Sequence, residues 1–544
     1  MLTLSKPLSA ARTQTYHKEE FANAQENYYS EGDHIRGEWH GKLANQWGLE
    51  GEVREEYFGR LAHGQHPITG EQLVRYQTAY EYVNRRGETV RAMEHRAAWD
   101  ATFSAPKSVS LTALVGGDDR VRQAHRESVN VALGEMEKYV QARPAETTGK
   151  WIAASFEHDS ARPVNGYAAP HLHTHVVFFN LTETQNGQSR AVQAYELLRS
   201  LEYTTAIYRS ELALRLKEQG YDMERGKSGQ PEIRGYTQEY LDASSPRSRQ
   251  IQAYLEEHGF RGAGAAQFAV HQTRDGKLPA ITHEAMQLKH RELAAHFGQQ
   301  AEQVIRAAEV RHIEEQSREQ KHQSVESALT YAQEKNLERH AVMDERELMR
   351  DALKHSMGEA GFADVRQQFE NRVQSGDLIQ VENRSPSRLF TTQEMIGYER
   401  NNIAQMRAGQ NRHEPMVSSE TWREVEGKHA HLSASQSAAV EQIVSSPDKI
   451  MGLEGVAGAG KIASLAAVRD AAEQGGYQVR GLAATSRAAH TLAESGIESE
   501  TLYRHLRRRE QPERGEKRLY ILDEASLAIT KQMNEFLDRL QGED

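Results

Sequence analysis

The 544-residue sequence predicts an α+β N-terminal region, then a small winged-helix-like module, then a partial α/β lobe. Residues 1–300 alternate short β-rich runs with amphipathic helical segments, a pattern typical of an antiparallel sheet covered by helices. Residues 301–345 are a nearly unbroken charged stretch, which predicts a solvated helical linker. A glycine-rich loop between a predicted strand and a predicted helix, near residue 455, indicates the α/β lobe.

Individual elements follow from apolar spacing and from breaker residues. In the first region we expect strands at 108–115, 151–156 and 170–180, and a helix at 120–140. Residues 346–410 predict a helix, a turn at 358–361, a second helix and a hairpin whose strands are 377–381 and 389–392. This order suggests a winged-helix-like module, which either binds duplex DNA or only packs against its neighbours. In the lobe, 430–544, we expect strands at 450–453 and 519–522.

Composition limits the classes of function. The formal net charge is −11 and 38% of residues are hydrophobic, as in a soluble multidomain protein. An acidic total does not exclude nucleic acid, because a local basic groove suffices to bind a polyanion. The absence of cysteine excludes disulfides and thiolate metal sites, so histidine and carboxylate are the available ligands. We find no leader and no apolar run long enough to span a membrane, which predicts a cytoplasmic protein.

Three histidines alternate at the head of the predicted strand 170–180. Side chains two residues apart share one face of a strand, so His171, His173 and His175 point the same way and predict a metal site. His158 ends the preceding strand and offers a ligand from a second element. Two alternatives stay open from spacing alone: ordinary polar residues on a solvated edge strand, or a metal site without a catalytic role.

Three blocks of sequence resemble the conjugative relaxases of the relaxase-helicase (MobF) family, a branch of the HUH endonucleases. They are FEHDSAR (156–162) with PHLHTH (170–175), WDATFSAPKSVS (99–110), and the tyrosine pair Tyr28-Tyr29. The resemblance implies a palm-like antiparallel sheet and metal ligands at His158, His173 and His175, with His171 as a neighbour. The loop between the two histidine blocks is longer here than the family pattern, and we expect a bulged loop with an intact site.

The resemblance also implies the catalytic groups. Tyr16 is the expected first nucleophile, and Tyr28 or Tyr29 is expected to carry out a second transfer. His17 stands where the family has a second tyrosine of the first pair, which puts redundancy at that position in doubt. Asp100 is expected either to accept the tyrosine proton or to hold a ligand histidine in the required tautomer.

The implied cofactor is a divalent metal, Mg²⁺ or Mn²⁺, with Zn²⁺ as an alternative. The implied DNA substrate is a plasmid transfer origin, read as single strand and as hairpin or duplex. Accessory relaxosome proteins and a type IV secretion coupling protein are further expected partners, in the bacterial cytoplasm. Basic residues are candidates for backbone contacts: Lys107, Arg162, Arg247, Arg249, Arg274 and Lys277.

The C-terminal lobe predicts a degenerate nucleotide site. A loop of this kind cradles phosphates with backbone N–H groups and a lysine, and an acidic pair at a strand end holds Mg²⁺. The lobe resembles the first motor lobe of superfamily 1 helicases, with an adenine-reading glutamine. The nucleotide-site candidates are Gln436, Gly455, Gly458, Gly460, Lys461, Asp523 and Glu524.

Two departures from the helicase pattern predict weak nucleotide binding and little hydrolysis. Ile462 stands where a Ser or Thr hydroxyl would ligate Mg²⁺. The acidic pair lies 20 residues before Asp544, so the motifs of a second motor lobe are absent and the helicase part is expected to be truncated and inactive.

The leading hypothesis is therefore strand-specific nicking and rejoining of origin DNA through a 5′-phosphotyrosyl adduct. The alternatives are a rolling-circle replication initiator and a catalytically inactive DNA-binding or assembly protein.

Overall fold

The computed structural model describes most of the chain and divides it into two compact units. The described residues are 2–18, 37–75, 80–83, 89–92, 95–260, 262, 265, 269, 272–273, 282–311, 318–383, 385–456, 459–508 and 516–540. Unit 1 comprises Met1–Gln333, Asp344–Asn371 and Glu382–Arg388, and unit 2 comprises Glu334–Met343, Arg372–Val381 and Leu389–Asp544.

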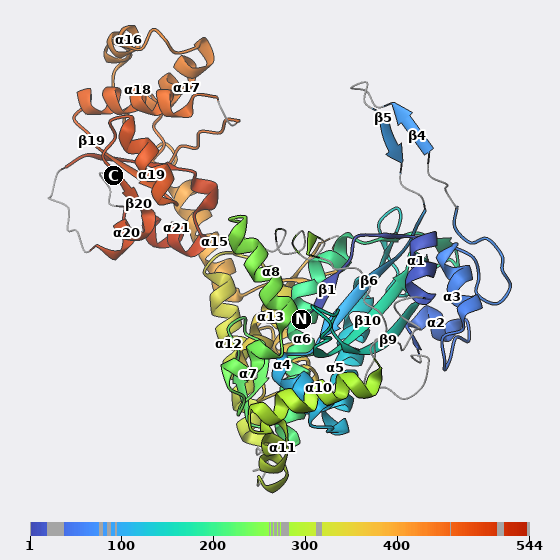
Figure 1. The fold of residues 1–544 in the computed structure, drawn as a ribbon. Coiled ribbons are helices and arrows are strands. Elements are labelled where there is room, and N and C mark those ends of the chain that lie inside the picture. The colour runs from blue at the N-terminus through green and yellow to red at the C-terminus, as the bar shows by residue number, and fades with distance from the viewer. Residues whose placement is uncertain are drawn as a thin grey trace. The chain divides into compact units, whose positions relative to one another are not determined.

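Unit 1 is built on an antiparallel sheet, as predicted for an α+β region (Figure 1). The strand order is β1-β6-β10-β9-β3, with β2 also paired to β6. The strands are β1 (Leu2–Leu4), β2 (Leu8–Ser9), β3 (Glu38–His40), β6 (Arg96–Ser104), β9 (Ala153–Ser160) and β10 (Pro170–Phe179). The central strand β10 alternates buried and half-buried residues over its first six positions and is fully buried over its last four. Its first half can therefore form a site, while its second half belongs to the core.

Helices cover both faces of this sheet. The apolar part of the histidine-bearing face packs against α1 (Ala10–Tyr16), α2 (Lys42–Gln46) and α3 (Glu55–Ala62), which Figure 1 shows together beside the sheet. Phe58, Phe156 and Phe179 are central to that core. The opposite face packs against α5 (Asp119–Met136) and α6 (Tyr195–Glu218), which lie against each other. The large apolar area buried on both faces accounts for a rigid platform under β10.

The strand predicted at 108–115 is wrong. The segment instead forms α4 (Lys107–Ser110) and a π-helical turn at Leu111–Val115. Its alternating hydroxyls mimic strand periodicity, but they bond backwards to carbonyls four residues earlier: Ser110 Oγ donates to Pro106 O at 3.0 Å and Thr112 Oγ1 donates to Ser108 O at 2.9 Å. Side-chain bonds of this kind let Ser and Thr sit inside a buried helix.

The charged stretch after residue 300 also differs from the prediction, because its helices are not simply solvated. α11 (Gln300–Val310) buries Ala301, Val304 and Ala308. α12 (Arg318–Leu337) buries four small or aliphatic side chains, Val325, Ala328, Leu329 and Ala332. A narrow apolar stripe at helical spacing is enough to bury one face of a helix that is otherwise charged.

Unit 1 also contains one further helix and most of a second. α13 (Glu345–His355) packs against α6, and α14 (Phe362–Ser375) follows it, with residues 362–371 in unit 1. Arg366 on α14 donates to Glu135 of α5 at 2.5 Å and to the Tyr203 hydroxyl of α6 at 2.7 Å, and it also pairs with Glu345. The predicted hairpin belongs to unit 2, where its strands β17 (Ile379–Val381) and β18 (Leu389–Thr391) pair antiparallel.

Unit 2 contains a parallel sheet of order β20-β19-β21, formed by Ser499–Thr501, Gln478–Ala483 and Arg518–Asp523. Its helices include α15 (Gln393–Ala408), α16 (Ser419–Lys428), α17 (Ala434–Val444), α18 (Lys461–Gln474), α19 (Ser486–Glu494), α20 (Leu502–Arg507) and α21 (Thr530–Leu537). The strand predicted at 450–453 is not formed. Residues 450–456 are exposed or half-buried, and Gly452 and Gly455 weaken the strand propensity of a short run.

The described helices are either too short or too polar to cross a lipid bilayer.

Candidate active site

The histidines predicted as metal ligands come together on adjacent strands. His173 of β10 lies directly opposite His158 of β9, and His175 lies opposite Phe156. The ring centroids are 5.3 Å apart for His158 and His173, 5.1 Å for His158 and His175, and 5.1 Å for His173 and His175. Imidazoles that share one tetrahedral cation, with metal–nitrogen bonds of about 2 Å, place their ring centroids roughly 5 Å apart. The spacing of the three rings therefore suits a single cation.

Hydrogen bonds orient two of these rings and leave the third without a protein partner. His175 Nδ1 donates to Asp100 Oδ2 at 2.8 Å, and His173 Nδ1 donates to the His171 carbonyl at 2.9 Å. Both bonds select the tautomer whose Nε2 carries the lone pair that a metal requires. His158 Nε2 is buried and has no hydrogen-bond partner in the structure. A buried nitrogen acceptor without a partner is costly, so this donor set fits a divalent cation.

The described side chains do not converge ready-made on a cation. No three His, Asp or Glu side chains among the described residues stand in a metal-holding arrangement. The His158 and His173 rings are stacked, with an interplanar angle of 26°. Binding would therefore require these rings to turn about their side-chain torsions.

The electrostatic setting keeps two of the ligand imidazoles, those of His158 and His173, neutral. Burial, followed by the nearby rings of His175 and His173, lowers the pKa of His158 well below its usual value. Burial, and then His175, lowers the pKa of His173 to about 3. Metals bind the neutral imidazole, so His158 and His173 can bind a cation at physiological pH without first losing a proton.

His171 stacks on His173 at the end of the group. The two ring centroids are 4.6 Å apart and the rings are 15° from parallel. Burial, and then His173, holds the pKa of His171 well below its usual value. The contact supports the interpretation of His171 as a neighbour of the metal ligands.

The loop between the histidine blocks forms a hairpin extension. Val164 and Tyr167 pair across a turn in which Asn165 has φ 50° and Gly166 has φ 77°, the left-handed values of a type I′ turn. The β9–β10 register shifts between Pro170 and His173. The expected bulge is therefore present, and the paired positions of His158 and His173 lie beyond it.

Asp100 reaches the site because β6 and β10 are antiparallel neighbours. It pairs with Val177, and Thr102 pairs with His175, so both residues lie on the histidine face. Thr102 Oγ1 lies 3.2 Å from His175 Nδ1 and 3.4 Å from Asp100 Oδ2. Thr102 was not among the predicted site residues, although it belongs to the 99–110 block that carries the resemblance. The geometry favours the tautomer-holding role of Asp100.

The helix that carries Tyr16 is anchored through its neighbour. α1 begins at an N-cap, Ser9, whose side chain accepts from Arg12 N, and it packs on α3 and β6. His17 follows the helix and is buried, with its ring 4.4 Å from Phe58 and 5.6 Å from Phe156, centroid to centroid. Burial lowers the pKa of His17. His17 is thus a core residue that fixes the end of α1. Tyr28 and Tyr29 lie outside the described residues.

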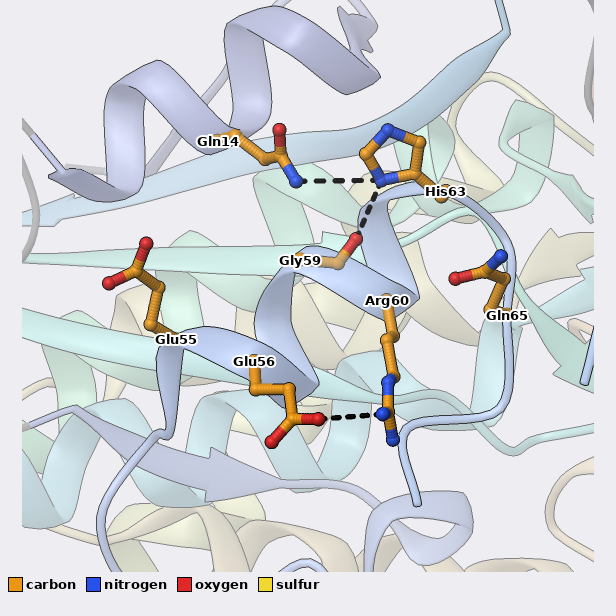
Figure 2. Close-up of a pocket in the computed structure, with 7 residues that line it drawn as sticks. All are labelled: Gln14, Glu55, Glu56, Gly59, Arg60, His63 and Gln65. Carbon is orange, nitrogen blue, oxygen red and sulfur yellow. Dashed lines mark hydrogen bonds and ion pairs between the residues drawn. The ribbon is translucent and has the colours of Figure 1, made fainter. Parts of the chain in front are cut away.

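A cavity of about 600 Å³ lies between α1 and α3 (Figure 2). It is lined by Gln14, Glu55, Glu56, Gly59, Arg60, His63 and Gln65. Figure 2 shows His63 Nδ1 between Gln14 Nε2, at 3.5 Å, and the Gly59 carbonyl, at 2.9 Å. Both carboxylates are in ion pairs, Glu56 with Arg60 and Glu55 with Lys18. The cavity includes none of the predicted ligands.

The candidate DNA contacts differ in their surroundings. Lys107 Nζ donates to the Pro170 carbonyl at 2.6 Å, and burial lowers its pKa to about 8. The structure thus places Lys107 at the start of β10 and not on an open phosphate-binding surface. Arg162 and Arg249 are exposed, and Arg247 donates to Gln250 Oε1 and Thr273 O. Arg274 and Lys277 lie outside the described residues.

The glycine-rich loop of unit 2 is closed on itself. Lys461 Nζ donates to the Gly455 carbonyl at 2.7 Å, and Gln436 Nε2 donates to the Ala459 carbonyl at 2.9 Å. Gly460 has φ 73°, a left-handed conformation that favours glycine. Gly458 lies outside the described residues.

Ile462 and the acidic pair Asp523-Glu524 lie in the same unit as this loop. Ile462 is half-buried against the lobe's core, and Asp523 ends β21, followed by Glu524. The loop lysine and acidic pair belong to one unit, but Ile462 contributes an apolar side chain where an oxygen ligand is needed.

Comparison with known proteins identifies both parts of the chain. Residues 10–297, more than half of the sequence, match the family model described as TrwC relaxase. The chain belongs to the TrwC relaxase family. The predicted relaxase resemblance is confirmed, and residues 431–544 match a model described as AAA domain.

Individual relatives agree with this family. The multifunctional conjugation protein TraI of Escherichia coli is 34% identical over 274 residues, 47% of this chain and 14% of that protein. The conjugal transfer protein TraA of Agrobacterium fabrum is 39% identical over 115 residues, 21% of this chain and 10% of that protein. A solved structure of the conjugative relaxase TrwC in complex with oriT DNA, in a metal-bound form, is 30% identical, covering 55% of this chain and 99% of that one, with a TM-score of 0.46. The chain thus aligns with a small part of its TraI and TraA relatives.

The TrwC relaxase match includes every residue of the N-terminal candidate site. Tyr16, Asp100, His158, His173 and His175 all fall between residues 10 and 297. The same range contains the cavity between α1 and α3 and the strands β3, β6, β9 and β10 of the sheet.

Proposed function

We propose that this chain is a metal-dependent DNA relaxase that nicks and rejoins one strand of a plasmid transfer origin. The observation that carries the proposal is the group of His158, His173 and His175, with Asp100 hydrogen-bonded to His175, on the sheet that supports the Tyr16 helix. Imidazole ligands for a cation, on a sheet that also packs against a tyrosine-bearing helix, supply what phosphodiester transesterification needs. The relatives TraI and TrwC are conjugation proteins, which supports the proposal that the DNA is a transfer origin.

In the proposed reaction the phenolic oxygen of Tyr16 attacks the scissile phosphorus and displaces the 3′ oxygen. One P–O bond forms as another breaks, which leaves a 5′-phosphotyrosyl enzyme and a 3′-hydroxyl that takes up the phenolic proton. Because the phosphodiester energy is kept in the new linkage, the reaction can run backwards and rejoin a strand. Tyr28 or Tyr29 would carry out the second transfer.

The protein's own side chains would hold the cation and fix the orientation of its ligands. His158, His173 and His175 would hold the cation, which when bound withdraws charge from a non-bridging oxygen of the phosphate. Asp100 keeps His175 in one tautomer through Nδ1. We propose Mg²⁺ or Mn²⁺ as the ion. A set of three nitrogen donors also suits Zn²⁺, which is the alternative.

The proposed substrate is origin DNA, partly single-stranded and partly hairpin or duplex, with Arg162, Arg247, Arg249, Arg274 and Lys277 as candidate backbone contacts. Accessory relaxosome proteins and a type IV coupling protein are proposed partners, in the bacterial cytoplasm. The AAA-domain match in the same chain favours conjugative transfer over rolling-circle replication, which needs no appended motor lobe of this kind.

Replacing Tyr16 by Phe is expected to abolish the first covalent adduct. The change removes only the nucleophilic oxygen. The full chain would be incubated with Mn²⁺ and a labelled single-stranded origin oligonucleotide, and adducts that survive denaturation would be counted on a gel. Tyr28→Phe and Tyr29→Phe are expected to keep this first adduct.

The matched control is Tyr195→Phe, because Tyr195 is 59% exposed and distant in sequence from the site. It should form the adduct at the wild-type rate. An undiminished adduct in the Tyr16→Phe, Tyr28→Phe double variant would contradict the transferase proposal. Absence of any adduct from the wild-type chain would favour a DNA-binding or assembly role.

We further propose that the C-terminal lobe binds nucleotide weakly and hydrolyses it little. Ile462→Thr is expected to tighten binding of Mg²⁺-ATP at least about tenfold, the range that a single metal-coordination partner commonly controls. Binding of a fluorescent ATP analogue with and without Mg²⁺ measures the effect. The control is Ile462→Val, because valine has the shape of threonine but lacks the hydroxyl. It should leave the affinity for Mg²⁺-ATP unchanged. Robust DNA-stimulated ATP hydrolysis by the wild-type chain would refute the proposal.

A further inference from the structure

A histidine that the proposed reaction does not use lies behind the ligand strand. His125 of α5 has no exposed surface, and both of its ring nitrogens are hydrogen-bonded. Nε2 lies 2.9 Å from Thr174 Oγ1, and Nδ1 lies 2.8 Å from the Tyr208 hydroxyl. Tyr208 is on α6 and is fully buried, while Thr174 on β10 is 5% exposed. Three buried polar groups thus form a continuous chain from α6 through α5 to β10.

The hydrogen-bonded series of Tyr208, His125 and Thr174 matters because of where Thr174 lies. Thr174 stands between His173 and His175, and alternation along a strand turns its side chain to the opposite face of the sheet. On the histidine face, Asp100 holds His175 at 2.8 Å. Directional hydrogen bonds therefore hold β10 on both faces, at Thr174 on one face and at His175 on the other.

The protonation states support a fixed geometry. Burial lowers the pKa of His125 to about 3, so the ring is neutral, with one nitrogen donating and the other accepting. Burial raises the pKa of Tyr208 far above its usual value, so its phenol keeps its proton. Packing alone does not require such a chain, since matched apolar groups in place of a buried hydrogen-bonded set can be nearly neutral for stability. Directional bonds instead add positional precision, which metal sites need within about 0.5 Å.

We infer that the chain Tyr208–His125–Thr174 positions His173 and His175 for cation binding. The inference rests on the metal site of the proposed function. The three side chains are positioning residues, because they lie on the face of the sheet opposite the histidines and act through the backbone of β10.

The test compares two substitutions at Thr174 in the full chain. Thr174→Val keeps the shape and removes the hydroxyl, whereas Thr174→Ser keeps the hydroxyl for His125. Titration calorimetry with Mn²⁺ alone, in the absence of DNA, measures the affinity. We expect Thr174→Val to weaken Mn²⁺ binding about tenfold, as groups that orient ligands commonly do, and Thr174→Ser to restore wild-type affinity.

A matched control separates positioning from a general loss of stability. Tyr221 donates from its hydroxyl to Asp118 Oδ2 at 2.5 Å and is buried in the same unit, and Asp118 keeps Arg120 as a partner. Tyr221→Phe also removes one buried hydrogen bond, so it should lower the free energy of unfolding, measured with urea, about as much as Thr174→Val. It should leave the Mn²⁺ affinity unchanged.

The outcomes distinguish this inference from the proposed function. Wild-type affinity in Thr174→Val, with the wild-type chain binding Mn²⁺, would overturn the inference and leave the metal site standing. Equal weakening in Thr174→Val and Tyr221→Phe would also overturn it, because the effect would then be one of stability. A wild-type chain that binds no Mn²⁺, Mg²⁺ or Zn²⁺ would overturn both.

Discussion

His158→Ala is expected to slow formation of the phosphotyrosyl adduct by about 10²–10³-fold, since a Lewis-acidic metal is worth several kcal/mol of transition-state stabilisation. His158 is the ligand contributed by β9, and its Nε2 is the buried nitrogen that has no protein partner. Its removal leaves two ligands from a single strand. The measurement is the single-turnover rate of adduct formation at saturating Mn²⁺, together with calorimetric Mn²⁺ affinity.

The control for His158→Ala lies in the same group of rings. His171 stacks on His173 but falls outside the matched ligand positions. His171→Gln should therefore keep the adduct rate and the Mn²⁺ affinity within a few-fold of wild type. If His158→Ala reacts at the wild-type rate, or if His171→Gln is the variant that loses the metal, the assignment of ligands is wrong.

The ligand strand could be predicted from the sequence because its signal is local. Alternation of His171, His173 and His175 is a property of consecutive residues, and a strand converts it directly into a shared face. The contact of Asp100 with His175 is different. It requires the antiparallel register of β6 against β10, because the two residues are 75 positions apart in the sequence. The family resemblance implied a role for Asp100, but only the register of the sheet shows that its hydrogen bond goes to His175.

Tertiary context overrode local patterns elsewhere. The hydroxyls of Ser110 and Thr112 gave a strand-like alternation, yet they bond to carbonyls within a buried helix. His17 has a polar side chain beside a candidate nucleophile, yet its environment is set by Phe58 and Phe156 from two other elements. His125 carried no sequence signal at all, since its partners Thr174 and Tyr208 come from separate elements. Such positions depend on packing between distant segments, which a single sequence does not reveal.

Arg366→Ala is expected to lower the free energy of unfolding of unit 1 by about 3 kcal/mol, the lower end for breaking a buried ion pair by removing one partner. Arg366 donates to Glu135 at 2.5 Å and pairs with Glu345, and these carboxylate side chains are 3% and 7% exposed. Arg388 and Lys138 remain as partners and limit the loss. Urea unfolding measures the effect. The exposed pair Arg306–Glu302 supplies the control, Arg306→Ala, with an expected change below about 0.5 kcal/mol.

The cause of that loss can be separated from simple removal of a side chain. If the loss comes from leaving buried Glu135 with only one of its two cationic partners, then combining Arg366→Ala with Glu135→Gln should cost less than the sum of the two single changes. Additive losses, or an Arg366→Ala variant as stable as wild type, would contradict this account.

The same charge network also predicts how much of the chain unit 1 needs for its stability. Residues 344–371 share this buried charge network with α5 and α6, so a chain cut near residue 300 would expose Glu135 and the α6 face that packs on α13. Its free energy of unfolding should fall by at least as much as that of Arg366→Ala.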